Sequence, residues 1–190
     1  MRHLYADKSM ELLRDQAEEV LKLAQMVHVF FEALPPYSIQ EATKIRETAT
    51  RAYSLMKEAA QKNGDKNSLY LTSCLHRIGE EIFQSLLEVS EFKMTPPAEI
   101  ALMAKYLEQA LKSISDSLAL YPGNSCLPHL IAIKKYAYEI NQIYKKARLD
   151  SFKDPHTVNG LKRSEISLRF SEAGELTHKI ADSLGEVITA

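Results

Sequence analysis

The fold is decided by residues 133–184, which read IKKYAYEINQIYKKARLDSFKDPHTVNGLKRSEISLRFSEAGELTHKIADSL. Two long stretches of this segment carry apolar residues at intervals of three and four, and Asp154-Pro155 separates them. Because side chains at this spacing lie on one face of an α-helix, each stretch predicts a helix with an apolar stripe to bury. The stripes are formed by Ile133, Ala137, Ile140, Tyr144 and Ala147, and by Ile166, Phe170, Ala173, Thr177, Ile180 and Leu184.

The same spacing recurs along the rest of the chain and predicts an all-α protein. The expected helices cover residues 9–34, 38–63, 67–93, 95–120, 125–152 and 154–188. Proline and glycine residues lie between these segments. We expect Thr95 to cap the fourth helix and Pro96-Pro97 to lie in its first turn. We expect Gly160 to mark a bend or a delayed start of the last helix. No segment alternates in polarity as a strand does, and short connections favour antiparallel neighbours, so the prediction is a six-helix bundle.

A weak internal repeat supports this organisation. Ile45-Arg46-x-x-Ala49 aligns with Ile133-Lys134-x-x-Ala137, and Gly79-Glu80 aligns with Gly174-Glu175. We therefore expect one domain over residues 1–190, built from two repeated three-helix units at about 9–93 and 95–190.

Composition excludes several classes of function. The chain of 190 residues has 24 basic and 25 acidic residues, so no overall charge favours nucleic acid or an anionic surface. No stretch is long and apolar enough to cross a membrane, and Met1-Arg2-His3 opens into a charged segment, so we expect no signal peptide. Cys74 and Cys126 lack metal-type spacing and are expected to be buried thiols. These features predict a cytoplasmic protein that touches a membrane only peripherally.

The motifs of common enzymes are missing from the sequence. A ferritin-like di-iron site needs two Glu-x-x-His pairs, and only Glu175-Leu176-Thr177-His178 occurs. There is no glycine-rich phosphate loop, no Cys-x-x-Cys and no nucleophile beside an evident base. We therefore expect no enzymatic activity.

The acidic residues near the stripes are the candidate metal ligands. Glu172 and Glu175 are three residues apart on one predicted helix, and Glu139 with Asn141 could face them from the preceding one. Oxygen ligands in this arrangement suit a divalent cation. His76 and Glu80, four residues apart, form a second and thinner candidate pair. The alternative, which the spacing alone favours, is a solvated seam.

In that alternative, Glu175 pairs with Lys179 four residues on. Other features are expected to be structural. Tyr136, Tyr138 and Tyr144 are interpreted as the edge of the core, and His28 and His129 as histidines without an acidic partner nearby on their own helix. The paired lysines of residues 133–163 are interpreted as a solvated face.

The chain resembles the PhoU-like proteins, in particular the branch of phosphate-transport accessory proteins found with low-affinity inorganic phosphate permeases. The resemblance covers nearly the whole chain. It is clearest at Asn141-Gln142-Ile143-Tyr144-Lys145-Lys146-Ala147-Arg148-Leu149, at Asp154-Pro155, and from Glu165-Ile166 through Glu172-Ala173-Gly174-Glu175 to Leu184. It implies six helices in two repeats, with acidic metal sites on the second and third helices and on the fifth and sixth.

This chain departs strongly from the family's acidic pattern. The positions on the second and third helices correspond to Ala49, Arg51, Tyr53, His76, Arg77 and Glu80. Two arginines there disfavour a cation because like charges repel. The positions on the fifth and sixth helices correspond to Ala137, Glu139, Asn141, Glu172, Glu175 and Lys179, which leaves a remnant site for at most one weakly held divalent ion.

The resemblance implies a non-enzymatic accessory or regulator of inorganic phosphate transport. Its partner would be a membrane phosphate permease or a sensor protein, and self-association is left open. The alternative is a helical scaffold that binds another protein and has no role in phosphate transport. An apolar face left exposed after bundle packing would favour either of these binding functions over an enzyme.

Overall fold

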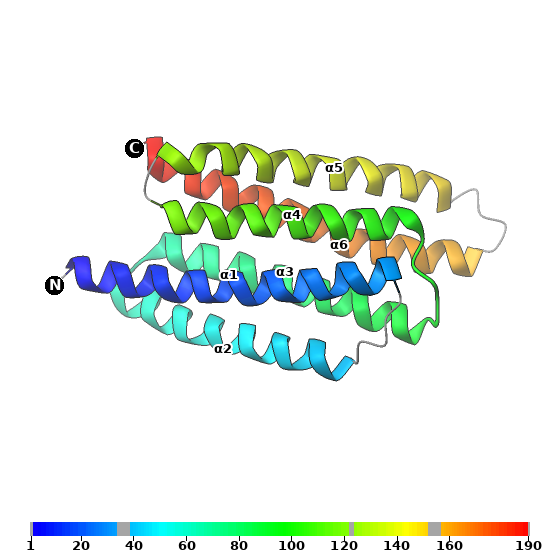
Figure 1. Cartoon of the computed structure of the whole chain (residues 1–190), viewed down its shortest axis with the longest axis horizontal. Coiled ribbons are helices and arrows are strands. Elements are labelled where there is room, and N and C mark those ends of the chain that lie inside the picture. Colours follow the sequence, from blue (N-terminus) through cyan, green and yellow to red (C-terminus); the bar gives the residue numbers. More distant parts are fainter. Residues whose placement is uncertain (1, 34–38, 122–123, 152–156, 190) are drawn as a thin grey trace.

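The computed structural model describes residues 2–33, 39–121, 124–151 and 157–189. These residues form six α-helices and no strand, which confirms the all-α prediction (Figure 1). The helices are α1 (Arg2–Ala33), α2 (Ile39–Asn63), α3 (Lys66–Glu91), α4 (Ala98–Leu120), α5 (Leu127–Ser151) and α6 (Thr157–Thr189). A 3-10 turn, η1 (Asn124–Cys126), precedes α5.

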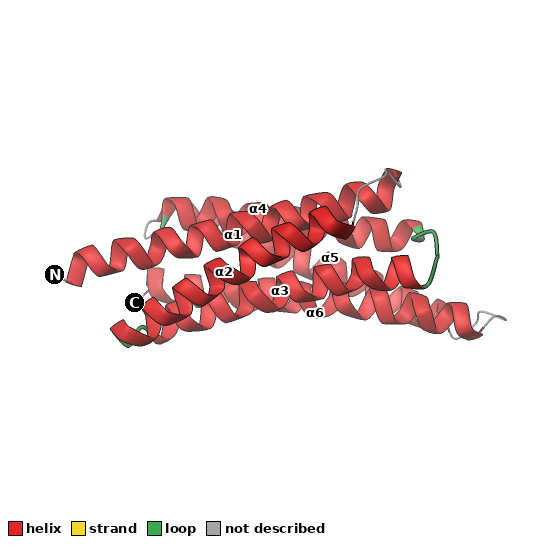
Figure 2. Ribbon diagram, turned by 90° about the horizontal axis from the view of Figure 1, so that it is seen from below, coloured by secondary structure: helices red, strands yellow, loops and turns green. Residues whose placement is uncertain are grey.

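The helices run lengthwise in an elongated bundle whose two halves pair in equivalent ways (Figures 1 and 2). Each half is a three-helix unit in which all three helices contact one another: α1, α2 and α3 in the first, α4, α5 and α6 in the second. The halves join through α1 against α4 and α3 against α6. This leaves α2 and α5 as the outer helices. The pairing is the one that two repeated units would give, although duplication itself stays a prediction.

The ends of the helices fall into two groups. Figure 1 shows the beginning of α1 and the end of α6 at the same end of the bundle. The end of α5 and the beginning of α6 lie at the opposite end, where both views show this hairpin reaching beyond the other helices.

Burial of the predicted stripes forms the core, except that Tyr144 and Ala147 near the end of α5 are only half-buried. Ile133, Ile140, Ile166, Phe170 and Ile180 are at most 2% exposed. The ring of Phe170 meets that of Phe31 edge-on, with centroids 5.8 Å apart, so α6 and α1 contribute to the same core. The two halves therefore share one hydrophobic core, although the sequence divides it between two units.

The helix ends show where local signals predicted well and where they did not. Asp65 caps α3 by accepting a hydrogen bond from the Ser68 backbone N–H. The prediction that Thr95 caps the fourth helix is wrong. Pro97 holds that position in an extended conformation, and its carbonyl accepts from the N–H groups of Ile100 and Ala101. The first helix also begins earlier than expected, at Arg2.

The start of the last helix is partly described. Helix α6 begins at Thr157 and continues through the buried Gly160, so Gly160 does not delay the helix. The expected start at Asp154-Pro155 lies outside the described residues. None of the described helices combines the length and the apolar character that crossing a bilayer requires.

The aligned glycines Gly79 and Gly174 are both buried, but their surroundings differ. At Gly174 a methyl group would lie only 3.1 Å from Cγ2 of Ile140, because α5 packs closely on α6 there. At Gly79 the nearest atom, Cγ2 of Val20, would lie at an ordinary contact distance of 3.6 Å. A methyl group would thus crowd the α5–α6 contact at Gly174, whereas at Gly79 it would make an ordinary contact.

Candidate functional site

The expected ligands on α5 and α6 flank this close contact. Ile140 and Gly174 are buried in the seam. Glu139 beside Ile140 is half-buried, whereas Asn141, Glu172 and Glu175 are exposed. Among the described residues, no three His, Cys, Asp or Glu side chains are grouped to hold a metal ion.

Glu175 already has cationic partners. Its Oε1 lies 2.6 Å from Nζ of Lys179, as the alternative interpretation of the sequence expected. This hydrogen bond and the charge of Lys179 lower the pKa of Glu175, and the charge of Arg77 from α3 adds to the effect. The carboxylate that was expected to bind a cation is therefore compensated by protein side chains.

His76 and Glu80 lie in a different setting, between α2 and α3. The His76 ring stacks on Tyr53, with centroids 4.1 Å apart and the planes almost parallel. Glu80 accepts two hydrogen bonds from Arg46, at 2.8 and 2.6 Å. Burial lowers the pKa of His76, and the charges of Arg46 and Lys57 add to this while Glu80 opposes it. The pair is thus engaged in contacts that join two helices.

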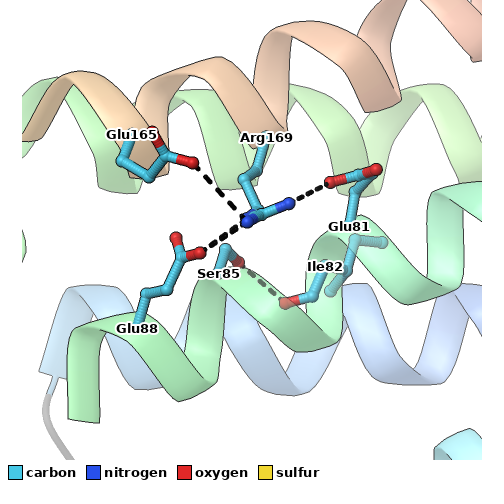
Figure 3. Close-up of polar contacts among 6 residues, drawn as sticks. All are labelled: Glu81, Ile82, Ser85, Glu88, Glu165 and Arg169. Atoms are coloured by element: carbon cyan, nitrogen blue, oxygen red, sulfur yellow. Dashed lines mark hydrogen bonds and ion pairs between the residues drawn. The ribbon is translucent and has the colours of Figure 1, made fainter. Parts of the chain in front are cut away.

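A polar cluster centred on Arg169 lies between α3 and α6 (Figure 3). Its guanidinium donates to Glu88 from Nε at 2.8 Å and to Glu81 from Nη1 at 3.0 Å. Glu165, one turn earlier on α6, lies 3.6 Å from Nη2. The Arg169 side chain is 26% exposed, and those of Glu81 and Glu88 are 15% and 13% exposed.

Three carboxylates around one guanidinium leave excess negative charge in this seam. Oε2 of Glu88 is buried and accepts no hydrogen bond from the described residues. The carboxylates raise the pKa of Arg169, mainly through the hydrogen bond to Glu88. Because Arg169 occupies the centre of the cluster, it fastens α6 to α3 and leaves no place there for a metal ion.

The expectation that His28 has no acidic partner is wrong. Its Nδ1 lies 2.5 Å from Oε2 of Glu108 on α4, and its Nε2 lies 3.0 Å from Oε1 of Glu32, four residues on. His129 has a looser acidic neighbour on another helix, Asp116 at 3.8 Å. His28 therefore bridges α1 and α4, where the two halves meet.

The outer face of α5 carries large apolar side chains that none of the described residues buries. Ile131 is 69% exposed and Tyr138 is 62% exposed, and their separation of seven residues places them on one face. The prediction that Tyr138 lies at the edge of the core is wrong, whereas Tyr136 is half-buried and stacks on Tyr106. We call Ile131 and Tyr138 the outer stripe. A search for apolar residues opposite the core stripe of α5 could have found it.

The other half of the bundle carries a groove that is lined by both apolar and polar side chains. It lies between α1 and α2, has a volume of about 540 Å³ and is lined by Ser9, Leu12, Leu55, Glu58, Ala59, Lys62 and Asn63. Glu58 and Lys62 pair with each other at its edge at 2.6 Å. The two charged side chains that line the groove therefore form an ion pair with each other.

A scan of the chain against models of protein families gives no match, and a search of curated proteins gives none either.

Proposed function

We propose that the protein is a non-enzymatic accessory of inorganic phosphate transport that acts by contact with a membrane phosphate permease or its sensor. The observation that supports a binding function is the outer stripe of α5. Ile131 and Tyr138 are more than 60% exposed on a helix whose opposite face is buried against α4 and α6. Large apolar side chains aligned on an outer helix are typical of a surface that another helix covers.

The assignment to phosphate transport rests on the resemblance to PhoU-like proteins. The six-helix architecture is compatible with that resemblance, and the paired state of Glu80 and Glu175 suits a member that works without a metal cluster. A helical scaffold without a phosphate role is the second candidate, and the same stripe supports it.

Affinity capture from native membranes tests the proposal. Tagged protein is incubated with detergent-solubilised membranes of the source organism, and the bound proteins are identified by mass spectrometry. We expect an inorganic phosphate permease or phosphate sensor to be recovered. The double variant Ile131→Ser/Tyr138→Ser should recover at least about tenfold less of it, because burial of each side chain is worth about 1.5–3 kcal/mol.

The matched control is Leu55→Ser on α2, which changes an apolar side chain that is 56% exposed on the other outer helix. It should capture the same partner as the unchanged protein. Recovery of soluble partners only would favour the scaffold function and reject the phosphate role. Equal recovery by the stripe variant and the control would reject the outer stripe as the binding surface.

A further inference from the structure

The end of the α5–α6 hairpin combines exposed apolar side chains with positive charge. Leu149 near the end of α5 is 63% exposed, and Val158 and Leu161 in the first turns of α6 are each 65% exposed. We call these three residues the hairpin tip. They are separate from the outer stripe, which lies nearer the other end of α5. Figures 1 and 2 show that this end of the two helices reaches beyond the neighbouring helices at the same end of the bundle.

The charge around the hairpin tip is unlike that of the whole chain. The described residues 145–151 and 157–165 contain five basic residues, Lys145, Lys146, Arg148, Lys162 and Arg163, and two acidic ones, Asp150 and Glu165. The whole chain has 24 basic and 25 acidic residues. Glu165 also lies beside Arg169. On α5 and α6 themselves, basic side chains therefore outnumber acidic ones at this end, and two acidic side chains of α3, Glu81 and Glu88, are held by Arg169.

The placement of the lysines leaves charge available at this end. Lys145 and Lys146 are exposed in the last two turns of α5. Lys162 is half-buried, and its Nζ lies 5.1 Å from the centre of the Phe92 ring at the end of α3. The apolar and basic side chains of this end are thus carried by the helices α5 and α6.

The shape of the tip favours a lipid surface over a folded protein as its partner. The three exposed apolar side chains lie at the end of a hairpin, so they could enter a bilayer at headgroup depth while the rest of the bundle stays outside it. A bilayer accepts apolar side chains at headgroup depth, and anionic lipids attract the lysines and arginines beside them. Hydrophobic contact and charge complementarity therefore point to the same partner.

We propose that the hairpin tip binds peripherally to anionic lipid membranes, with Leu149, Val158 and Leu161 at headgroup depth and Lys145 and Lys146 against the lipid anions. This contact does not depend on the phosphate role. It would place the protein upright on the membrane, with the outer stripe free along its side.

Sedimentation with lipid vesicles tests the proposal. The purified full-length protein is mixed with vesicles of phosphatidylcholine and phosphatidylglycerol, or of phosphatidylcholine alone. We expect binding to the anionic vesicles that weakens as salt is added, because the attraction between charges is screened. Leu149→Ser/Leu161→Ser should lower the affinity at least about tenfold through lost apolar burial. Lys145→Gln/Lys146→Gln should lower the affinity and also reduce its salt dependence.

The control Leu55→Ser/Lys44→Gln makes the same kinds of change on α2 and should bind like the unchanged protein. Thermal melting monitored by circular dichroism confirms that each variant is folded. Failure of the unchanged protein to sediment with anionic vesicles at low salt would overturn the proposal. So would equal binding by the tip variants and the control. Because the vesicles contain no protein, these outcomes are separate from capture of a permease.

Discussion

Arg169 joins α6 to two carboxylates of α3, those of Glu81 and Glu88. Replacing it with Met should lower the free energy of unfolding by about 2–4 kcal/mol, because Glu81 and Glu88 would stay largely buried without their cation. Urea unfolding followed by circular dichroism measures the change. The control Arg51→Met alters an exposed arginine on α2 and should stay within about 0.5 kcal/mol of the original. Equal effects of the two substitutions would contradict the role of the cluster.

His76 gives the fold a predictable pH dependence. Its pKa in the folded protein is lowered, chiefly by burial, so the unfolded chain binds a proton more readily. The stabilisation from the neutral ring is therefore present above the unfolded pKa of about 6.5 and is lost as the pH falls through the folded pKa. His76→Phe keeps a ring to stack on Tyr53 but cannot titrate. Between pH 7 and pH 5 its melting temperature should fall less than that of the unchanged protein, and an identical fall would refute this role.

The acidic residues of α5 and α6 are expected to bind no divalent ion tightly. Because Lys179 already neutralises Glu175, we expect divalent ions such as Mg²⁺ or Mn²⁺ to leave the melting temperature unchanged. The matched variant replaces Glu139, Glu172 and Glu175 with Gln. A rise in melting temperature that the unchanged protein shows and this variant loses would establish a metal site on α5 and α6.

Helix pairs are best tested at the two glycines that the repeat aligns. Gly79→Ala should stabilise the protein by about 0.5–1 kcal/mol, because Ala favours the helix and its methyl group has room. Gly174→Ala gains the same helix propensity but forces a methyl group against Ile140, and such overpacking costs about 1–3 kcal/mol. We therefore expect opposite signs in chemical denaturation. Equal stabilisation at both sites would show that α5 and α6 separate easily.

The helices were predictable because their signal is local, whereas the polar contacts between them were not. Periodic apolar residues such as Ile140 and Phe170 place a stripe on one face whatever its partner, and both are buried. Arg169 and Glu88 are 81 residues apart in the chain, so no spacing rule connects them. The prediction of a cap at Thr95 failed although threonine is a common capping residue. Pro97 has the extended conformation of the residue before the helix, so the helix begins after it.

At the scale of the whole molecule, the shared core predicts that the two halves unfold together. Cys74 in α3 and Cys126 in η1 provide one buried thiol in each half, and burial raises the pKa of Cys74. With Cys74→Ser and Cys126→Ser, each thiol can be followed alone by its labelling rate in increasing urea. Both should become reactive with the same free energy of opening. Reaction of one thiol at much lower urea would mean that its half opens independently.

The common end shared by the start of α1 and the end of α6 has a consequence for the order of the chain. A linker that crosses this end of the bundle could join the two, and new termini could be opened between α3 and α4, in residues 92–97. Such a circular permutant would place α4–α6 before α1–α3 while keeping the helix pairings, the Arg169 cluster and the shared core. If this permutant folds, the contacts between the helices determine the fold, and the order of the two halves along the chain does not.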